Sequence, residues 1–377
     1  MEYISFDKVC DVFSGYAFKK FNDLKEGKPV IKIGNIKANG EINTNTCTYT
    51  EETPLEKFNS KKDDLYVALS GATTGKVGLM EAEGFLINQR VGIVRRIIDY
   101  VPIKYIHFFM NSITDRILKD AVGAAQPNIS PKDILKYKFP LRSKEEMEEI
   151  TGILAEISTA IIKNKENIKA LDELIKSQFI EMFGDVENCD NTVELQDVCL
   201  KITDGSHNPP AGIDISNNYM ISSQNIHDNI IDYKDVRYLS DSDFQKEDKR
   251  TSIQLDDVLL TIVGAIGRSA IVKDDINITC QRSVCVIHPD KEQINSIFLK
   301  CMLDDLSERI INEARGVAQK GIYLNQVKKL QVICPSMELQ NKFSDFVKQI
   351  DKSKFLIKRQ IELLEELLNK KMDEYFK

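Results

Sequence analysis

The stretch from Lys144 to Phe183 reads KEEMEEITGILAEISTAIIKNKENIKALDELIKSQFIEMF, and the rest of the chain is arranged around it. Its apolar residues recur alternately four and three positions apart, a spacing typical of a coiled-coil helix. Asn164 and Gln178 interrupt the series. The apolar seam positions are Ile150, Leu154, Ile157, Ile161, Ile168, Leu171, Ile175 and Met182.

A second copy of this arm runs from Met337 to Phe376, 193 positions further along the chain. Because a long domain lies between the arms, we expect them to pair antiparallel within the chain. The predicted register sets Asn164 opposite Lys354, since gathering the polar seam residues into one layer leaves neither stranded among aliphatic neighbours. It also aligns Ile161 with Ile357, Ile157 with Ile361, Leu154 with Leu364 and Leu171 with Val347. The second seam comprises Phe343, Val347, Ile350, Ile357, Ile361, Leu364, Leu368 and Tyr375, interrupted by Lys354 and Lys371.

The whole chain repeats with this period. In each half a strand-like run enters a glycine loop, residues 71–76 or 264–268, and a predicted helix follows, 103–120 or 294–314, ending at Gly123 or Gly316. The sequence therefore predicts an α+β fold with pseudo-two-fold symmetry, in which two similar α/β domains are separated by two long helices that form an antiparallel coiled coil. The predicted boundaries are 1–143 for the first domain, 144–184 for the central helix, 185–336 for the second domain and 337–377 for the C-terminal helix.

Composition limits the possible functions. The chain has 377 residues and a formal net charge of −7, so at least two domains are expected. The first domain is basic and the second acidic. The acidic charge of the whole chain argues against indiscriminate nucleic-acid binding, but a local binding face can still be basic. No leader and no apolar run of eighteen residues is present, which predicts a cytoplasmic protein without membrane contact. The eight cysteines form no CxxC pair, so we expect reduced thiols and no bound metal.

The repeated loops supply candidates for DNA recognition, because amide and guanidinium groups are suited to reading base edges. The leading candidates are Lys76, Gln89, Arg90, Arg268, Gln281 and Arg282; Gln126, Asn128, Gln319 and Lys320 follow in the segments after the predicted helices. Each has a simpler interpretation. The two repeated arginines could form structural salt bridges, and Gln126 and Gln319 could tie a loop to the backbone. His207 is expected to be a loop hydrogen-bond partner and not a catalyst.

Taken in order and in duplicate, these features resemble the DNA specificity subunit of type I restriction-modification systems, HsdS, along the entire chain. The resemblance includes Ser14-Gly-Tyr-Ala-Phe18 in the first half and Asp204-Gly-Ser-His207 with Pro209 in the second. It implies two target-recognition domains that each read one half of a split site in double-stranded DNA. It also implies that the helices dock two methyltransferase subunits, which bind S-adenosylmethionine, whereas this chain holds no cofactor. Whether restriction motor subunits join is left open. The second copy departs where Gln319-Lys-Gly replaces Gln126-Pro-Asn.

Two other classes of function remain open: a tandem-domain scaffold that binds only protein, and an enzyme with an unrecognised nuclease site. The sequence has no Walker loop. Asn208-Pro-Pro-Ala211 carries alanine where amino-methyltransferases place an aromatic residue that stacks on the flipped base. The repeats differ in polar loop residues and agree in apolar ones, as two different half-sites would require. We therefore favour a non-catalytic DNA-reading subunit, whose DNA binding should weaken steeply with salt.

Overall fold

The computed structural model describes residues 2–22, 25–37, 40–80, 82–121, 127–186, 189, 191–315 and 321–377, without the side chains of 313–315. The chain forms two compact units. The first unit comprises Met1–Lys165 and Arg359–Lys377, and the second unit comprises Glu166–Lys358. Each unit therefore combines one globular domain with parts of both long helices.

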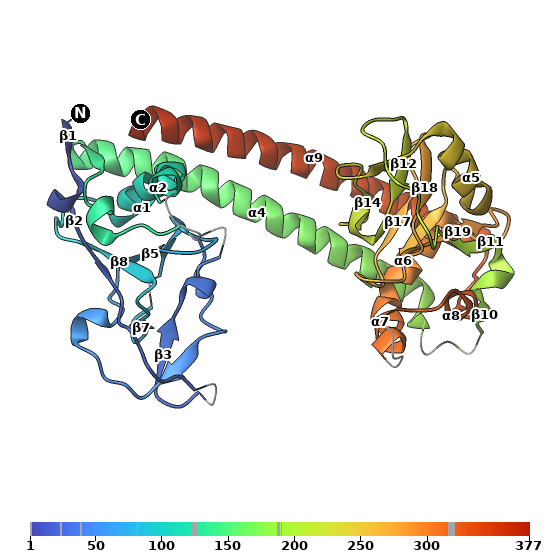
Figure 1. The fold of residues 1–377 in the computed structure, drawn as a ribbon, viewed down its shortest axis with the longest axis horizontal. Helices are drawn as coiled ribbons and strands as arrows, with labels where there is room; N and C mark the ends of the chain where they lie inside the picture. Colours follow the sequence, from blue (N-terminus) through green and yellow to red (C-terminus); the bar gives the residue numbers. More distant parts are fainter. Residues whose placement is uncertain are drawn as a thin grey trace. The chain divides into compact units, whose positions relative to one another are not determined.

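A four-stranded antiparallel sheet, in the order β2-β8-β5-β6, lies at the centre of the first unit. Figure 1 labels three of these strands, β2, β8 and β5. Along β5, Leu65 and Val67 belong to one hydrophobic cluster, and Tyr66 and Ala68 belong to another. Successive residues of a strand point to opposite faces, so this sheet is covered on both sides. Its strands are β2 (Cys10–Ser14), β5 (Leu65–Ala68), β6 (Val77–Leu79) and β8 (Val91–Arg96).

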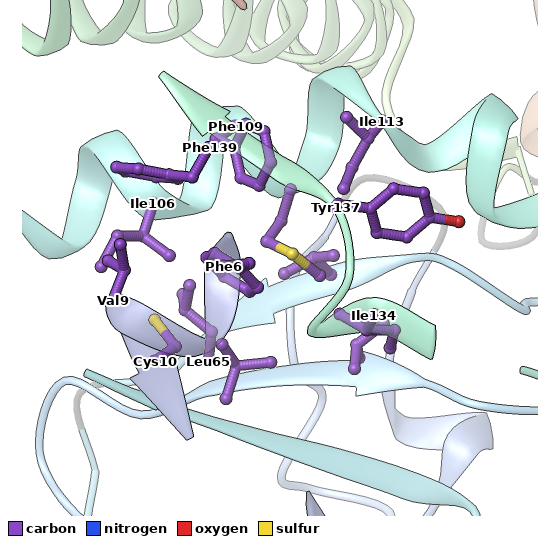
Figure 2. Close-up of a cluster of buried hydrophobic side chains, with 14 of the residues drawn as sticks. Phe6, Val9, Cys10, Leu65, Ile106, Phe109, Ile113, Ile134, Tyr137 and Phe139 are labelled. Carbon is purple, nitrogen blue, oxygen red and sulfur yellow. The ribbon is translucent and has the colours of Figure 1, made fainter. Parts of the chain in front are cut away.

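Two smaller sheets complete the first domain. In the three-stranded sheet, β3 pairs antiparallel with β4 and parallel with β7, and in the two-stranded sheet β1 pairs with β9. The strands are β1 (Glu2–Ser5), β3 (Lys28–Ile31), β4 (Thr48–Thr50), β7 (Leu86–Ile87) and β9 (Lys138–Leu141). Several aromatic rings meet in the main hydrophobic cluster of this domain: the ring centroids of Phe6 and Phe109 are 5.3 Å apart, and those of Phe109 and Phe139 are 5.0 Å apart (Figure 2).

The second unit repeats this arrangement, with sheets ordered β11-β19-β16-β17, β15-β12-β18 and β10-β20. The parallel pair recurs as β12 with β18. It also contains the short pair β13 (Ile226–His227) and β14 (Ile230–Ile231), and helix α5 (Asp241–Thr251), which Ser240 caps. The remaining strands are β10 (Val193–Glu194), β11 (Cys199–Asp204), β12 (Asn218–Ile221), β15 (Arg237–Tyr238), β16 (Val258–Thr261), β17 (Ser269–Ile271), β18 (Asn277–Cys280), β19 (Val284–Pro289) and β20 (Gln331–Val332).

Each helix predicted inside a domain is interrupted. In place of one helix over 103–120 the structure has α1 (Ile103–Ser112) and α2 (Thr114–Asp120), and in place of 294–314 it has α6 (Ser296–Asp305) and α7 (Ser307–Arg315). The breaks fall at Ile113 and Leu306, which are both buried, so the bend turns the helix while keeping its apolar side on the core. The predicted terminal glycines, Gly123 and Gly316, lie outside the described residues. Short helices α3 (Pro131–Ile134) and α8 (Leu324–Lys328) follow.

The two long helices are α4 (Lys144–Phe183) and α9 (Met337–Phe376), the stretches that the seam predicted. Within each unit they run antiparallel. In the second unit the ring of Phe343, near the start of α9, lies 5.5 Å from that of Phe179, near the end of α4. In the first unit Phe376, at the end of α9, shares a cluster with Met147, at the start of α4. No helix in the described part of the chain is long and apolar enough to cross a membrane.

The predicted register of the two helices is wrong. It would set Phe343 opposite Ile175, whereas the Phe343 ring contacts Phe179 and Phe183, one and two helical turns further on. The ammonium of Lys354 bonds the carboxylate of Asp172, eight residues beyond the expected partner Asn164. Burial of large aromatic rings at the arm ends outweighs the gain from a polar layer. A lysine at a seam position can extend its ammonium to a half-exposed carboxylate beside the seam.

Candidate DNA interface

The glycine loops follow β5 and β16 and are built alike. Gly75 and Gly267 have φ values of +83° and +86°, a conformation that favours glycine. A Cβ on Gly75 would approach the Thr114 carbonyl oxygen of α2 to 3.3 Å, and one on Gly267 would approach the Ser307 carbonyl oxygen of α7 to 3.4 Å. Each glycine loop therefore packs directly against the helix that follows the helix break, α2 in the first unit and α7 in the second.

The two loop cations differ in their surroundings. Lys76 is half-buried, and its backbone N–H donates to the Thr73 carbonyl. Arg268 is exposed, its backbone N–H donates to the Thr261 hydroxyl, and its guanidinium donates to the Ile226 carbonyl at 3.4 Å. The repeat therefore places a cation in both loops, but among the described residues only Arg268 has a side-chain bond that could hold its direction.

The Gln-Arg pairs lie on tight turns that glycines make possible. A Cβ added to Gly15 would overlap the Ile87 carbonyl, and one added to Gly205 would overlap the Cys280 carbonyl. The backbone N–H of Gln89 donates to the Tyr16 carbonyl, and that of Arg282 donates to the Ser206 carbonyl, both at 2.9 Å. The close crossing fixes both turns at the end of the central sheet. It places Arg282 where the first unit has Gln89, so the two Gln-Arg pairs are offset by one residue and the expected equivalence of Arg90 and Arg282 is wrong.

The arginines of these pairs, Arg90 and Arg282, are exposed, and within the described residues neither forms an ion pair. The structural salt bridge of the first unit is made by Arg95, which bonds the buried Asp64 at 2.6 Å. Its hydrogen bond to Asp64 raises the pKa of Arg95. At the equivalent place in the second unit His288 bonds Asp257 at 2.9 Å. The fold therefore bonds these buried carboxylates through other residues and leaves both arginines available.

Three of the predicted residues of the first unit meet in one hollow of about 830 Å³. Gln89 and Arg90 line it together with Asn128, whose segment is joined to the sheet end by a hydrogen bond from the Ile129 N–H to the Leu69 carbonyl at 2.9 Å. The complete lining is Ser14, Leu69, Ser70, Gln89, Arg90, Pro127, Asn128, Ile129, Ser130 and Pro131. Lys76 is not part of it.

The second unit has the same join, since the Ile322 N–H donates to the Ile262 carbonyl at 2.9 Å. There Gly321 occupies the place of Asn128 and Val263 that of Ser70. Gln126, Gln319 and Lys320 lie outside the described residues. The sequence interpretation missed Ser70 and Ser130. Ser70 has a buried hydroxyl without a hydrogen-bond partner among the described residues. The sequence held one signal for this residue: the first repeat has the polar Ser70 at the position where the second repeat has the apolar Val263.

His207 occupies the loop position expected of it. Its Nε2 bonds the Asp204 carboxylate at 2.7 Å, and Arg250 bonds the same carboxylate from α5. Burial raises the pKa of Asp204, but the hydrogen bonds from Arg250 and His207 outweigh it and hold that pKa below its usual range. Among the described residues no group of three or more His, Cys, Asp or Glu side chains could hold a metal ion.

Comparison with known proteins identifies the family. The family model described as the type I restriction modification DNA specificity domain matches residues 1–171 and again residues 192–366. The EcoBI type I restriction enzyme specificity subunit of Escherichia coli is 24% identical over 384 residues, covering 92% of this chain and 78% of that protein.

Solved structures agree in fold. The type I restriction-modification S subunit of M. genitalium has a TM-score of 0.57 at 14% identity, covering 100% of this chain and 96% of its own. A structure that describes complex assembly and conformational transition of the type I R-M system has a TM-score of 0.58 at 13% identity, covering 100% of this chain and 97% of its own. The chain therefore belongs to the family of type I restriction-modification DNA specificity proteins. It is a DNA specificity subunit, and its family is non-catalytic.

Proposed function

We propose that the two domains read the two halves of a split site in double-stranded DNA, each through the edge of its central sheet that carries the glycine loop and the Gln-Arg pair. The observation that carries this proposal is that one scaffold presents two different sets of polar groups. Gln89, Arg90 and Asn128 line the hollow of the first unit, whereas Gly321 replaces Asn128 in the second. Amide and guanidinium groups can pair bidentately with base edges, so different sets suit different half-sites.

We further propose that the arms recruit two methyltransferase subunits, which supply S-adenosylmethionine and the chemistry, and that restriction subunits can join them. Support comes from apolar residues that lie off the seam and repeat with it. Ile162 and Phe355 are 58% and 69% exposed, and Leu174 and Leu367 are 44% and 41% exposed. Each pair is 193 positions apart. An arm that presents one apolar pattern twice suits two copies of one partner. We place the assembly in the cytoplasm, where its DNA is.

Co-expression with a methyltransferase subunit encoded beside this gene, followed by sequencing of methylated adenines in host DNA, tests the proposal. The expected result is a two-part motif with a non-specific gap. Exchange of residues 185–336 for those of a relative with another specificity should change one half of the motif and leave the other. A change in both halves would overturn the assignment of one half-site to each domain, and a complex without methylation would overturn the recruitment of a competent enzyme.

A further inference from the structure

The segment that joins each glycine loop has the same geometry in both units but opposite chemistry. In the first unit Ser70 pairs with Asn128 in an antiparallel bridge, so a hydroxyl and an amide lie side by side. In the second unit Val263 pairs with Gly321 in a bridge of the same kind. The two pairs therefore occupy the same place in the repeated fold, although one pair is polar and the other is apolar.

The neighbouring positions change in the same sense. Ser130 caps α3 in the first unit, where its hydroxyl accepts a hydrogen bond from a backbone N–H of the helix. The residue at the start of α8 is instead Tyr323, which is 53% exposed. Between the two glycines of the loop, the first unit has Thr73, and the second has Ile266. The hydroxyls of Ser70 and Thr73 are buried without a hydrogen-bond partner among the described residues.

Gly321 leaves the side chain of Val263 accessible. A Cβ added to Gly321 would approach Cγ2 of Val263 to 3.2 Å, so any larger residue at this position would lie against the valine. Val263 is itself only partly buried, and its backbone N–H donates to the Ser283 carbonyl at 3.4 Å. Ser283 directly follows Arg282. The second unit therefore presents aliphatic groups beside the turn that we assign to DNA.

The two kinds of surface suit different bases. In the major groove each base pair presents its own pattern of hydrogen-bonding groups, and thymine adds a methyl group at C5. Hydroxyl and amide groups discriminate among bases by hydrogen bonds, whereas aliphatic and aromatic groups contact the thymine methyl. A base edge without this methyl would lose water against Val263 and gain no hydrogen bond there, which is unfavourable.

We propose that the second domain recognises a thymine in its half-site through the C5-methyl group, which contacts Val263 and the ring of Tyr323. At the equivalent place the first domain forms hydrogen bonds to its base through Ser70 and Asn128. The inference rests on the proposed reading of one half-site by each domain. It adds the kind of contact that this position makes and the base that the second domain selects.

The test combines a change in the protein with a change in the DNA. The full-length chain, co-expressed with its methyltransferase subunit, is titrated with a duplex that carries the motif found by methylation sequencing. Each thymine of the second half-site is replaced in turn by uracil, which lacks only the methyl group. One replacement should weaken binding about fourfold, the effect expected from exposing one buried methyl group. Every replacement in the first half-site serves as a DNA control for position.

Val263→Ser, which introduces the residue that the first unit carries, should bind the thymine duplex about fourfold more weakly than the wild-type chain does. It should bind the thymine and uracil duplexes equally, because the contact that distinguishes them is gone. The matched control is Leu255→Ser. Leu255 is 45% exposed and precedes β16, at the end of the strand away from the glycine loop. This control should keep the wild-type preference for thymine.

Tyr323→Ser keeps the proposal testable if Val263→Ser folds poorly, since it changes an exposed residue to the one that caps α3 in the first unit. It should reduce the preference for thymine over uracil. A preference that persists in full in both variants would overturn the assignment to these residues. Sequence-specific binding that no uracil replacement weakens would overturn the methyl contact. Absence of sequence-specific binding would instead contradict the proposed reading of a split site.

Discussion

At the scale of the residue, the fold exposes the side chains of Arg90 and Arg282 without pairing them with a carboxylate among the described residues. Their turns are held by backbone hydrogen bonds, and their guanidinium groups are exposed. The buried carboxylates of Asp64 and Asp257, which directly precede β5 and β16, are bonded by Arg95 and His288. A side chain that the fold does not need is free to vary with the DNA sequence that is read.

Arg90→Ala should lower the affinity for the cognate site by about 1–3 kcal/mol and relax the sequence requirement in one half-site, since a bidentate contact to a base would be lost. Competition binding and methylation sequencing measure the two effects. Arg359→Ala, which removes an exposed guanidinium paired with Glu362 on α9, is the control and should change neither. An equal loss of affinity on all DNA sequences would show that Arg90 contacts phosphate and not a base.

Gly15→Ala should destabilise the first unit by about 1–3 kcal/mol, because the added Cβ would overlap the Ile87 carbonyl and the backbone must move. Gly34→Ala is the matched control, since a Cβ at Gly34 meets nothing within 4 Å, and it should change stability by less than about 0.5 kcal/mol. Urea unfolding followed by circular dichroism gives both values. Equal stability of the two variants would show that the tight crossing at Gly15 is unimportant.

The stabilising effect of the Asp204 carboxylate should depend on pH. Because its pKa is lowered in the folded protein, the carboxylate contributes its full stability above the unfolded value of about 4, and this contribution is lost as the pH falls through the folded pKa. Asp204→Asn should therefore destabilise the chain at neutral pH, and the difference from the wild-type protein should shrink in acid. Thermal unfolding of both proteins across this pH range measures it. A difference that grows in acid would contradict the sign.

At the scale of the element, each arm ends in a phenylalanine that enters a domain core. Phe376 of α9 lies 5.1 Å from the ring of Tyr105 and is 5% exposed. Its repeat equivalent, Phe183 of α4, lies 4.9 Å from the ring of Phe298. These aromatic contacts, and not the polar residues of the seam, accompany the register that the helices adopt.

Phe376→Ala should therefore destabilise the first unit by about 3–5 kcal/mol, the usual cost of truncating a buried aromatic side chain. Phe355→Ala removes the same group from an exposed position of the same helix, and it should change stability by less than about 0.5 kcal/mol. Hydrogen exchange resolved by unit should place the loss in the first unit. Loss of protection confined to residues 166–358 would refute this assignment.

The sequence predicted the elements better than their contacts. Seam spacing predicted both long helices, and the period of 193 residues predicted the duplicated domains, because burial patterns repeat in the chain itself. The register could not be predicted, since Phe343 contacts residues of α4 that its seam position does not specify. The helix breaks at Ile113 and Leu306 were missed because both residues fit an uninterrupted apolar pattern. In the candidate interface, Ser70 was missed because its surroundings depend on a segment more than fifty residues away.

At the scale of the whole molecule, the length of the arms should set the distance between the half-sites. Insertion of one heptad between Ile161 and Leu171, with a matching heptad between Lys354 and Leu364, adds about 10.5 Å of helix. That rise corresponds to about three base pairs at 3.4 Å each. The methylated motif should gain about three base pairs of non-specific gap while both half-sites stay the same. An unchanged gap would mean that the arms do not determine the spacing.

The division of the chain between the two units also bears on the order in which they are completed during synthesis. The second unit is one continuous segment, Glu166–Lys358, whereas the first unit requires Arg359–Lys377 from the far end of the chain. Phe376, the last residue of α9, packs against Tyr105. Although the ribosome makes the first domain before the second, the core of the first unit is completed only after α9 has been made. A prematurely terminated chain therefore leaves the first unit with an exposed apolar surface, which marks it for proteolysis before it can join a complex.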